Sequence, residues 1–342
     1  MMSPTAAPPS PWLRRFAWTL AGLTLLLICS GGIVTSKGVG LAVPDWPTTF
    51  GYNMFLFPAS QWVGGIFFEH THRLIASTIG FLTIILAVWL WRTEMRWLGL
   101  AALGAVVLQG VLGGLRVTML KDEIGIFHAC LAQAFFGLLV YIARSLSSFP
   151  EQRAAKRAAF SWIALVATTL IYLQLALGAT MRHQHRDLSI LDFPTAYGSV
   201  IPDVSRPSLA AINQWRDARA LSDVTAGQIW LQMAHRFGAL FIAAAVIGFW
   251  FAVRSRCSSA SSGMRALSGW WLFFLMCQIT LGAWTIWSNK AADIATAHVA
   301  VGATMLAFGV VISTRCVRAP QLAASTRSVA QHLPIREGVH SL

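Results

Sequence analysis

The chain has 342 residues, of which 56% are hydrophobic and only 11% are charged, and its mean hydropathy is +0.61. These values exclude an ordinary soluble enzyme and a disordered chain, because the apolar residues form blocks of about 20 separated by short polar segments. The net charge of +13 could indicate nucleic-acid binding. A dispersed excess of Lys and Arg is also what membrane topology requires, so we expect no nucleic-acid partner.

Taken in chain order, eight apolar segments are long enough to cross a hydrocarbon layer of roughly 30 Å. They cover residues 16–36, 65–91, 98–119, 124–143, 159–180, 229–252, 267–288 and 293–314. The first is preceded by two arginines but leads to no small-residue cleavage site, so we expect a retained helix and not a signal peptide. The sequence therefore predicts an all-α integral membrane protein with eight transmembrane helices surrounded by lipid.

The distribution of basic residues predicts the orientation of these helices. A cluster of four basic residues, Arg144, Arg153, Lys156 and Arg157, follows the fourth segment, whereas Lys290 stands alone between the last two. By the positive-inside rule the cluster is cytoplasmic. Both termini are then cytoplasmic, and the long loops at about 37–64 and 181–228 face outward.

An internal repeat divides the chain into two halves. The pattern D-[WF]-P-T-x-[FY]-G begins at Asp45 and returns at Asp192, 147 residues later. Further parallels are Gln109-Gly110-Val111-Leu112-Gly113 with Gln278-Ile279-Thr280-Leu281-Gly282, and His72-Arg73 with His235-Arg236. Four helices per half is an even number, so we expect two pseudo-symmetric four-helix bundles related by an axis along the membrane normal.

The predicted division has five parts. They are an N-terminal cytoplasmic segment at 1–15, a first half at 16–143, a basic cytoplasmic linker at 144–158, a second half at 159–314 and a cytoplasmic tail at 315–342.

Four histidines fall inside predicted helices, one in each even-numbered helix: His72, His128, His235 and His298. Each lies about five to seven residues past the outer start of its helix, a depth of roughly 8–11 Å. A zinc or non-haem iron site would need further ligands at this level, whereas a haem with two axial imidazoles needs only two. The alternative for each histidine is a hydrogen-bonded polar residue within the bundle.

One position distinguishes the halves chemically. Glu69 precedes His72 by three residues on the same helix face, and the matching position before His235 holds Gln232. This asymmetry suggests chemistry in the first half and a permanently bound cofactor in the second. The alternative is an interfacial acid paired with Arg73.

Other polar residues near the outer face have weaker signals. Arg73 and Arg236 directly follow histidines and could pair with haem propionates, or could instead extend to the interface. We expect an interfacial position for His70, and a solvated or loop-packing role for His183 and His185.

Together these residues resemble the haem A synthase family, membrane enzymes that convert haem O to haem A for cytochrome oxidase. The resemblance covers about residues 15 to 315. It rests on Glu69-x-x-His72-Arg73, Gln109 to Gly114, His128, His235-Arg236, His298 and Pro44-Asp45-Trp46-Pro47.

The resemblance implies a role for each of these residues. It implies that His235 and His298 are axial ligands of a resident haem b, and that His72 and His128, with Arg73, hold the substrate haem O. In the same way Glu69 is the catalytic carboxylate for oxidation of the C8 methyl group to a formyl group in successive steps. Arg236 and Arg182 are the implied propionate contacts.

The chain also departs from the family pattern at two places. Thr35 stands where many relatives carry an arginine, although the paired position in the second half keeps Arg182, and no cysteine pair occurs in an outer loop. Two alternative functions remain at this stage: a di-haem, cytochrome b-like electron carrier, and a haem transporter.

The resemblance also implies partners and a location. It implies the cytoplasmic membrane of a bacterium, haem O synthase acting upstream and cytochrome oxidase assembly factors downstream. The electron acceptor, and whether the protein is a monomer or a homo-oligomer, are left open.

Overall fold

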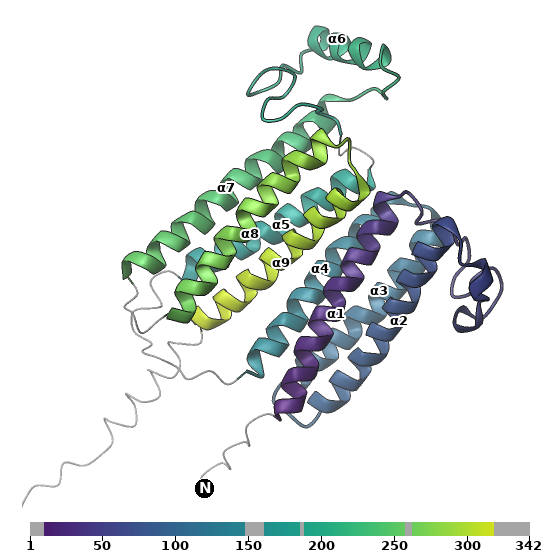
Figure 1. Cartoon of the computed structure of the whole chain (residues 1–342), viewed down its shortest axis with the longest axis vertical. Coiled ribbons are helices and arrows are strands. Elements are labelled where there is room, and N and C mark those ends of the chain that lie inside the picture. Colours follow the sequence, from purple (N-terminus) through teal and green to yellow (C-terminus); the bar gives the residue numbers. More distant parts are fainter. Residues whose placement is uncertain (1–9, 148–160, 185–187, 257–261, 318–342) are drawn as a thin grey trace, which may run out of the picture.

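The computed structural model describes residues 10–147, 161–184, 188–256 and 262–317, and within them the regular structure is helical (Figure 1). The helices are α1 Pro11–Ser36, α2 Gly64–Leu90, α3 Arg96–Met119, α4 Asp122–Ser145, α5 Ser161–His183, α6 Arg206–Asp217, α7 Ala226–Arg256, α8 Ser262–Trp287 and α9 Ala292–Val317. Two short 3-10 helices, Met54–Leu56 and Ala59–Gln61, lie between α1 and α2. Residues 148–158 of the predicted linker at 144–158, the first nine residues, residues 318–342 of the predicted tail and His185 lie outside the described residues.

The eight predicted transmembrane segments are confirmed. In the described part of the chain, eight helices are long and apolar enough to cross a membrane, and the protein is a multi-pass membrane protein. One further helix, α6, lies inside the second predicted loop and was not predicted. Its 12 residues span only about 18 Å, too short to cross the hydrocarbon layer.

Local sequence signals explain where several helices begin and end. Ser10 caps α1 by accepting a hydrogen bond from the Trp12 backbone N–H at 3.3 Å, with a proline in the first turn. Helix α4 carries Asp122 in its first turn and Arg144 in its last, which complements the helix dipole. Helix α3 ends where Leu120 adopts a left-handed conformation, φ 55°.

The long helices form two groups. Helices α1 to α4 contact one another around one apolar core, and α5, α7, α8 and α9 around another (Figure 1). The groups meet where α9 packs on α1 and α4, and where α4 packs on α5. That the two groups are related by a twofold axis stays a prediction.

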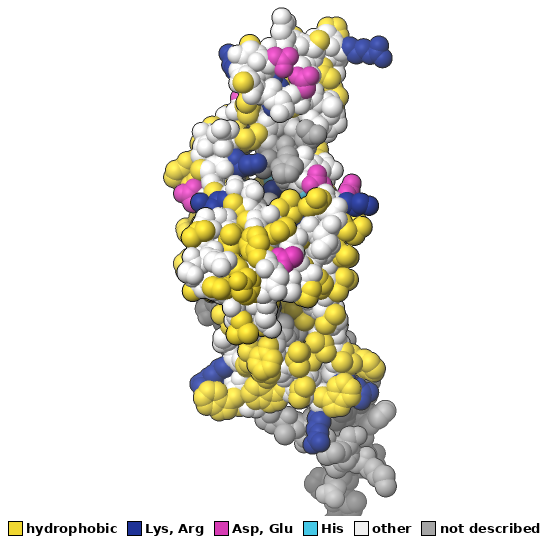
Figure 2. Space-filling model, turned by 90° about the vertical axis from the view of Figure 1, so that its right-hand side faces the viewer, with side chains coloured by type: hydrophobic (Ala, Val, Ile, Leu, Met, Phe, Trp, Pro, Cys, Tyr) yellow, Lys and Arg dark blue, Asp and Glu magenta, His cyan; other side chains and the backbone are white. Residues whose placement is uncertain are grey.

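The outward faces of the helices are apolar. Leu240 and Phe241, in the middle of α7, are 65% and 66% exposed. Hydrophobic side chains cover much of the face in Figure 2, and Lys and Arg lie toward its upper and lower margins. An apolar exterior of this extent is stable only against lipid. Polar side chains inside the helices bond locally, as where the Thr83 hydroxyl donates to the Ile79 carbonyl at 2.7 Å.

Both long connecting segments lie at one end of the helices, which we call the loop end. Segment 37–63 joins α1 to α2, and segment 184–225, which contains α6, joins α5 to α7 (Figure 1). Helices α2, α4, α7 and α9 begin at this end and carry the four histidines. The connections therefore place all four histidines toward the same side of the protein.

Candidate functional site

The four histidines lie six to nine residues past the loop-end start of their helices. At 1.5 Å per residue this corresponds to about 9–14 Å from each helix start. Each side chain is partly buried, and the Nδ1 atom of each ring is fully buried. Among the described residues, none of these Nδ1 atoms has a hydrogen-bond partner.

Each imidazole packs against a glycine of a neighbouring helix. A Cβ added at Gly31 would lie 3.0 Å from Cε1 of His72, and one at Gly282 would lie 3.1 Å from Cε1 of His298. The corresponding distances are 3.3 Å for Gly113 to His128 and 3.4 Å for Gly178 to His235. We call Gly31, Gly113, Gly178 and Gly282 the glycine seats. At Gly31, Gly113 and Gly282 an added methyl group would press on the imidazole, whereas at Gly178 it would make an ordinary contact.

The glycine seats occupy equivalent positions in the two repeats, although they were not identified as a set from the sequence. Gly31 and Gly178 are separated by the same 147 residues as the two loop motifs, and Gly113 and Gly282 occupy matching positions in the two Gln-x-x-x-Gly segments. The repeat spacing was the signal that could have found them. It indicates that both halves hold their histidines in the same manner.

The histidines interact in pairs. His72 and His128 are close enough to influence each other electrostatically, and so are His235 and His298. The Gln278 side-chain nitrogen lies 3.4 Å from Nε2 of His298. Gln109, at the matching position of the first half, has a buried side-chain oxygen without a partner in the described part of the chain, as does Gln278.

The donor set fits a haem better than a metal held by protein alone. No group of three or more His, Cys, Asp or Glu side chains is gathered within the described residues. Two imidazoles per site satisfy the axial positions of a porphyrin iron, whose other four ligands come from the porphyrin. At Gly113 and Gly178, an added Cβ would meet Cε1 and Nδ1 of His128 and His235 within 4 Å but not Nε2, the atom that would bind the iron.

Glu69 is buried and holds both Arg73 and the first loop. Its Oε1 accepts from Nη2 of Arg73 at 2.8 Å, and its Oε2 accepts from the Val43 backbone N–H at 2.9 Å. Arg73 also donates to the carbonyl oxygens of Val43 at 2.8 Å, Asp45 at 2.7 Å and Thr48 at 3.1 Å. The structure thus contains the Glu69–Arg73 pair that the sequence offered as an alternative, and it ties the loop to the helix of His72.

The second half repeats this arrangement without the carboxylate. Gln232 accepts from the Ile190 backbone N–H at 2.7 Å and donates to the Ile190 carbonyl at 3.1 Å. Arg236 donates to the carbonyls of Asp192 at 2.6 Å and Thr195 at 2.7 Å. Gln232 therefore reproduces the loop contact of Glu69, but it carries no charge, and its amide bonds the Ile190 carbonyl where Glu69 bonds Arg73.

An aspartate stabilises each loop from within. Asp45 accepts from the hydroxyl of Thr48 at 2.5 Å and from the backbone N–H groups of Phe50 at 2.8 Å and Gly51 at 2.9 Å. Burial raises the pKa of Asp45, but these hydrogen bonds to the charged form outweigh it and hold the pKa below its ordinary value. Asp192 makes the matching bonds with Thr195, Tyr197 and Gly198.

The interfacial position expected for His70 is wrong. Its side chain is fully buried beneath the first loop, where it lies against the rings of Phe57 and Trp62, with Nδ1 3.3 Å from the Thr49 hydroxyl. Alternation along a helix showed that His70 points away from His72, but it could not show that the loop folds back over it. His183 is buried too, and it packs against Gly125 of α4.

Two further arginines lie near the histidine pairs. Arg182 donates to the Gly32 carbonyl at 3.3 Å and to the Ser36 hydroxyl, both in α1, and interacts electrostatically with His298. Arg116, in α3, interacts electrostatically with His72 and His128. Arg116 was not selected from the sequence. The signal that could have identified it is the difference between the two repeats, because Thr285 stands at the matching position of the second repeat.

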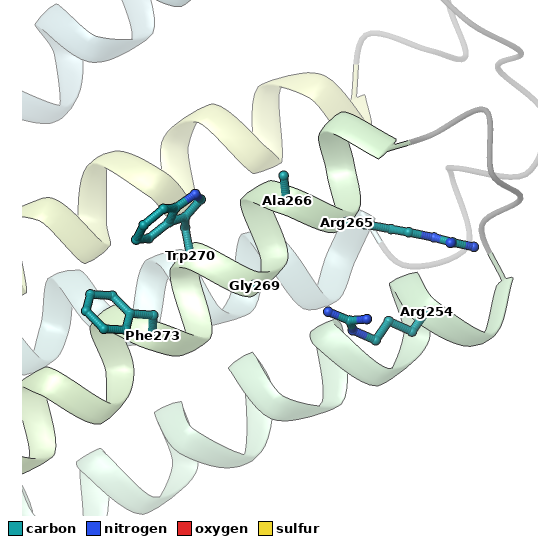
Figure 3. Close-up of a pocket in the computed structure, with 6 residues that line it drawn as sticks. All are labelled: Arg254, Arg265, Ala266, Gly269, Trp270 and Phe273. Carbon is teal, nitrogen blue, oxygen red and sulfur yellow. The ribbon is translucent and has the colours of Figure 1, made fainter.

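The two best-defined cavities do not contain the histidines. One, of about 540 Å³, lies between α7 and α8 and is lined by Arg254, Arg265, Ala266, Gly269, Trp270 and Phe273 (Figure 3). Arg254 follows His235 by 19 residues in the same helix, which is about 28 Å. The other, of about 560 Å³, lies at the second loop beside Tyr197 and Trp215.

The fold defines a multi-pass membrane protein that carries two pairs of histidines near one end. The family COX15-CtaA, described as cytochrome oxidase assembly protein, matches residues 14–310, and the chain belongs to this family. The resemblance drawn from the sequence motifs is thereby confirmed.

Curated relatives carry a more specific name. A heme A synthase of Rhodopseudomonas palustris (strain HaA2) is 30% identical over 93% of this chain and 93% of its own length. One of Geobacillus kaustophilus (strain HTA426) is 26% identical over 91% of this chain and 95% of its own length. A third, of Shouchella clausii (strain KSM-K16), is 30% identical over 56% of this chain and 66% of its own length.

Proposed function

We propose that this protein is a haem A synthase, an oxidoreductase that converts the C8 methyl group of haem O to a formyl group in successive oxidation steps. The observation that carries the proposal is the two histidine pairs on glycine seats: one helical turn before His72 lies the buried carboxylate of Glu69, and the matching position before His235 holds the amide of Gln232. The name shared by the full-length relatives supports the same activity.

We assign the two sites different ligands. His72 and His128 hold the substrate haem O, and His235 and His298 hold a resident haem b. A haem b with two imidazole ligands supplies one-electron transfer, because it has no open coordination position for a substrate. The difference in charge supports this division, since the position of Glu69 is occupied in the second half by the uncharged Gln232.

Glu69 is the group best suited to accept protons released from the methyl group. Its carboxylate is buried, so it is shielded from bulk solvent, and Arg73 fixes its Oε1. A base must lie near the reacting carbon, and Glu69 is one helical turn from His72 on the same face. Arg73 is a positioning residue in this proposal, because its guanidinium is committed to Glu69 and to three loop carbonyls.

The second repeat suggests which substitution best tests the role of Glu69. Gln232 makes the loop contact with an amide, so Glu69→Gln keeps that contact and removes the charge. We expect Glu69→Gln to fold, to retain haem b and to bind haem O, but to form no haem A. Glu69→Ala should lose the loop contact as well as the activity. Gln232→Ala is the matched control for the loop contact in the other half.

The experiment is to purify each variant from cells that make haem O, extract the porphyrins and separate them by mass. Haem A, or a hydroxylated intermediate, should be present with the wild type and absent with Glu69→Gln. Unmodified haem in every sample, at two per chain in the wild type, would favour the di-haem electron carrier and exclude the synthase. Wild-type activity in Glu69→Gln would exclude only the role of the carboxylate.

Membrane orientation and partners complete the proposal. We propose that the loop end faces outward across a bacterial cytoplasmic membrane, with both termini in the cytoplasm, because four basic residues follow α4 in the sequence whereas Lys290 stands alone between α8 and α9. Haem O synthase would supply the substrate, and cytochrome oxidase assembly factors would receive the product. The common level of the four histidines opposes transmembrane electron transfer, for which haems would lie at two depths.

A further inference from the structure

Arg116 lies in the last turn of α3, at the loop end of the first histidine pair. Its guanidinium faces Gly40 of the first loop, where an added Cβ would come within 3.1 Å of Nη2 and 3.2 Å of Nη1. It interacts electrostatically with both His72 and His128. Arg116 thus lies against the loop, close enough to the two imidazoles that we assign to the substrate to act on them electrostatically.

In the described part of the chain, the guanidinium of Arg116 has no protein hydrogen-bond acceptor. Arg116 makes no hydrogen bond there and no ion pair within 4.0 Å, and only the longer-range charges of Glu69 and Asp122 act on it. The contrast is with Arg73, whose donors are directed to loop carbonyls and to Glu69. A partly buried arginine has five donors in a fixed planar arrangement, which suits a carboxylate.

The two halves exchange the position of one arginine. Arg116 of α3 matches Thr285 of α8 in the second half, by the register that aligns Gln109 with Gln278. Conversely Arg182 of α5 matches Thr35 of α1, by the register that aligns Asp192 with Asp45. Each histidine pair therefore has one arginine in addition to the arginine that secures its loop, but supplied from a different helix.

We infer that Arg116 binds a propionate carboxylate of the porphyrin held between His72 and His128. This inference rests on the proposed function and extends it by naming the group that orients the substrate. In a haem, the C8 methyl group and one propionate are substituents of the same pyrrole ring. Anchoring that propionate at Arg116 turns the methyl group toward the loop end, the region of Glu69.

The test compares two probes that differ only at the propionates. Full-length protein that retains its tightly bound haem is titrated with haemin and with haemin dimethyl ester, and binding is followed by the Soret absorption band. We expect Arg116→Gln to weaken haemin binding by about tenfold or more and to leave the ester within about twofold of the wild type, since a charge-assisted hydrogen bond is lost only for the acid. Arg116→Lys should fall between the two.

Controls separate this inference from the function on which it rests. Lys121→Gln removes a nearby exposed charge and should change neither affinity, which tests for a general electrostatic effect. His128→Ala should remove the additional low-spin signal that each added probe produces, and leave that of the retained haem; an unchanged titration would refute the first-half site and the proposed function with it. If His128→Ala behaves as expected but Arg116→Gln weakens both probes equally, or neither, the propionate role of Arg116 alone is refuted. Unaltered ester binding also reports that the Arg116 variants are folded.

Discussion

Replacing a glycine seat with alanine should weaken haem binding without unfolding the protein. At Gly282, the new methyl group would lie 3.1 Å from Cε1 of His298, 3.7 Å from Nδ1 and 3.8 Å from Nε2. Ordinary carbon contacts begin near 3.4 Å, so the imidazole must move by a few tenths of an ångström. Overpacking of this kind typically costs about 1–3 kcal/mol.

The same substitution favours the helix itself. Alanine is better than glycine in a helix interior by about 1 kcal/mol, so Gly282→Ala has opposed effects on folding and on the ligand. Displacement of the axial imidazole should lower haem b affinity by about tenfold, which corresponds to about 1.4 kcal/mol. Gly178→Ala, with its 3.4 Å contact to His235, should have a smaller effect.

The measurement is haem b content per chain after detergent purification, together with the low-spin absorption spectrum and the temperature of unfolding. Gly269→Ala is the matched control, because it lies in the same helix and a Cβ there meets nothing within 4 Å. It should keep full haem b and gain stability. If Gly282→Ala and Gly269→Ala retain the same haem b with the same spectrum, the glycine seats do not position the ligands.

Three further predictions concern the loops and the junction between the halves. Hydrogen bonds hold the pKa of Asp45 below its ordinary value of 3.8 in the folded protein, so the stability that its carboxylate gives to the loop should persist from neutral pH to about 4 and be lost as the pH falls further. Limited proteolysis across this range should show that profile for the wild type. Asp45→Asn should be cleaved in the loop at every pH. Gly114→Ala should displace the Trp46 indole, whose Cε3 would lie 2.7 Å from the new methyl group, and weaken haemin binding about fivefold. Adding Trp46→Phe to the same chain should restore binding, because the second half carries this smaller pair, Phe193 with Ala283, at the matching positions. Arg182→Gln should lower the unfolding temperature by a few degrees in a thermal scan, because the bonds from α5 to Gly32 and Ser36 are lost; an unchanged scan would show that they add no stability.

The sequence predicted the membrane helices well, because hydrocarbon thickness sets both their length and their composition. Each predicted span overlaps one observed helix, with ends that differ by a few residues where caps extend it, as Ser10 does for α1. Helix α6 was missed because its 12 residues are amphipathic and polar on average, so a search for apolar blocks passes over it.

The four histidines were selected from the sequence, but the contacts that support them were not. Histidine in an apolar segment is costly enough to be conspicuous in the sequence. The partners of Glu69 depend on how the loop folds back, and spacing alone does not show whether Arg73 points to a ligand or to loop carbonyls. Arg116 was overlooked for a related reason, since a basic residue near a helix end most often marks only the membrane interface.

Two consecutive glycines in α1 serve different halves of the molecule. Gly31 seats His72, while an added Cβ at Gly32 would lie 3.2 Å from Thr296 of α9, two residues before His298. The helices that carry His72 and His298 therefore flank a single helix, whose neighbours pack at about 8–10 Å between axes. Helix α1 acts as a spacer of fixed thickness, so its packing on α2 and α9 helps to set the separation of the two histidine pairs and does not depend on the length of any loop.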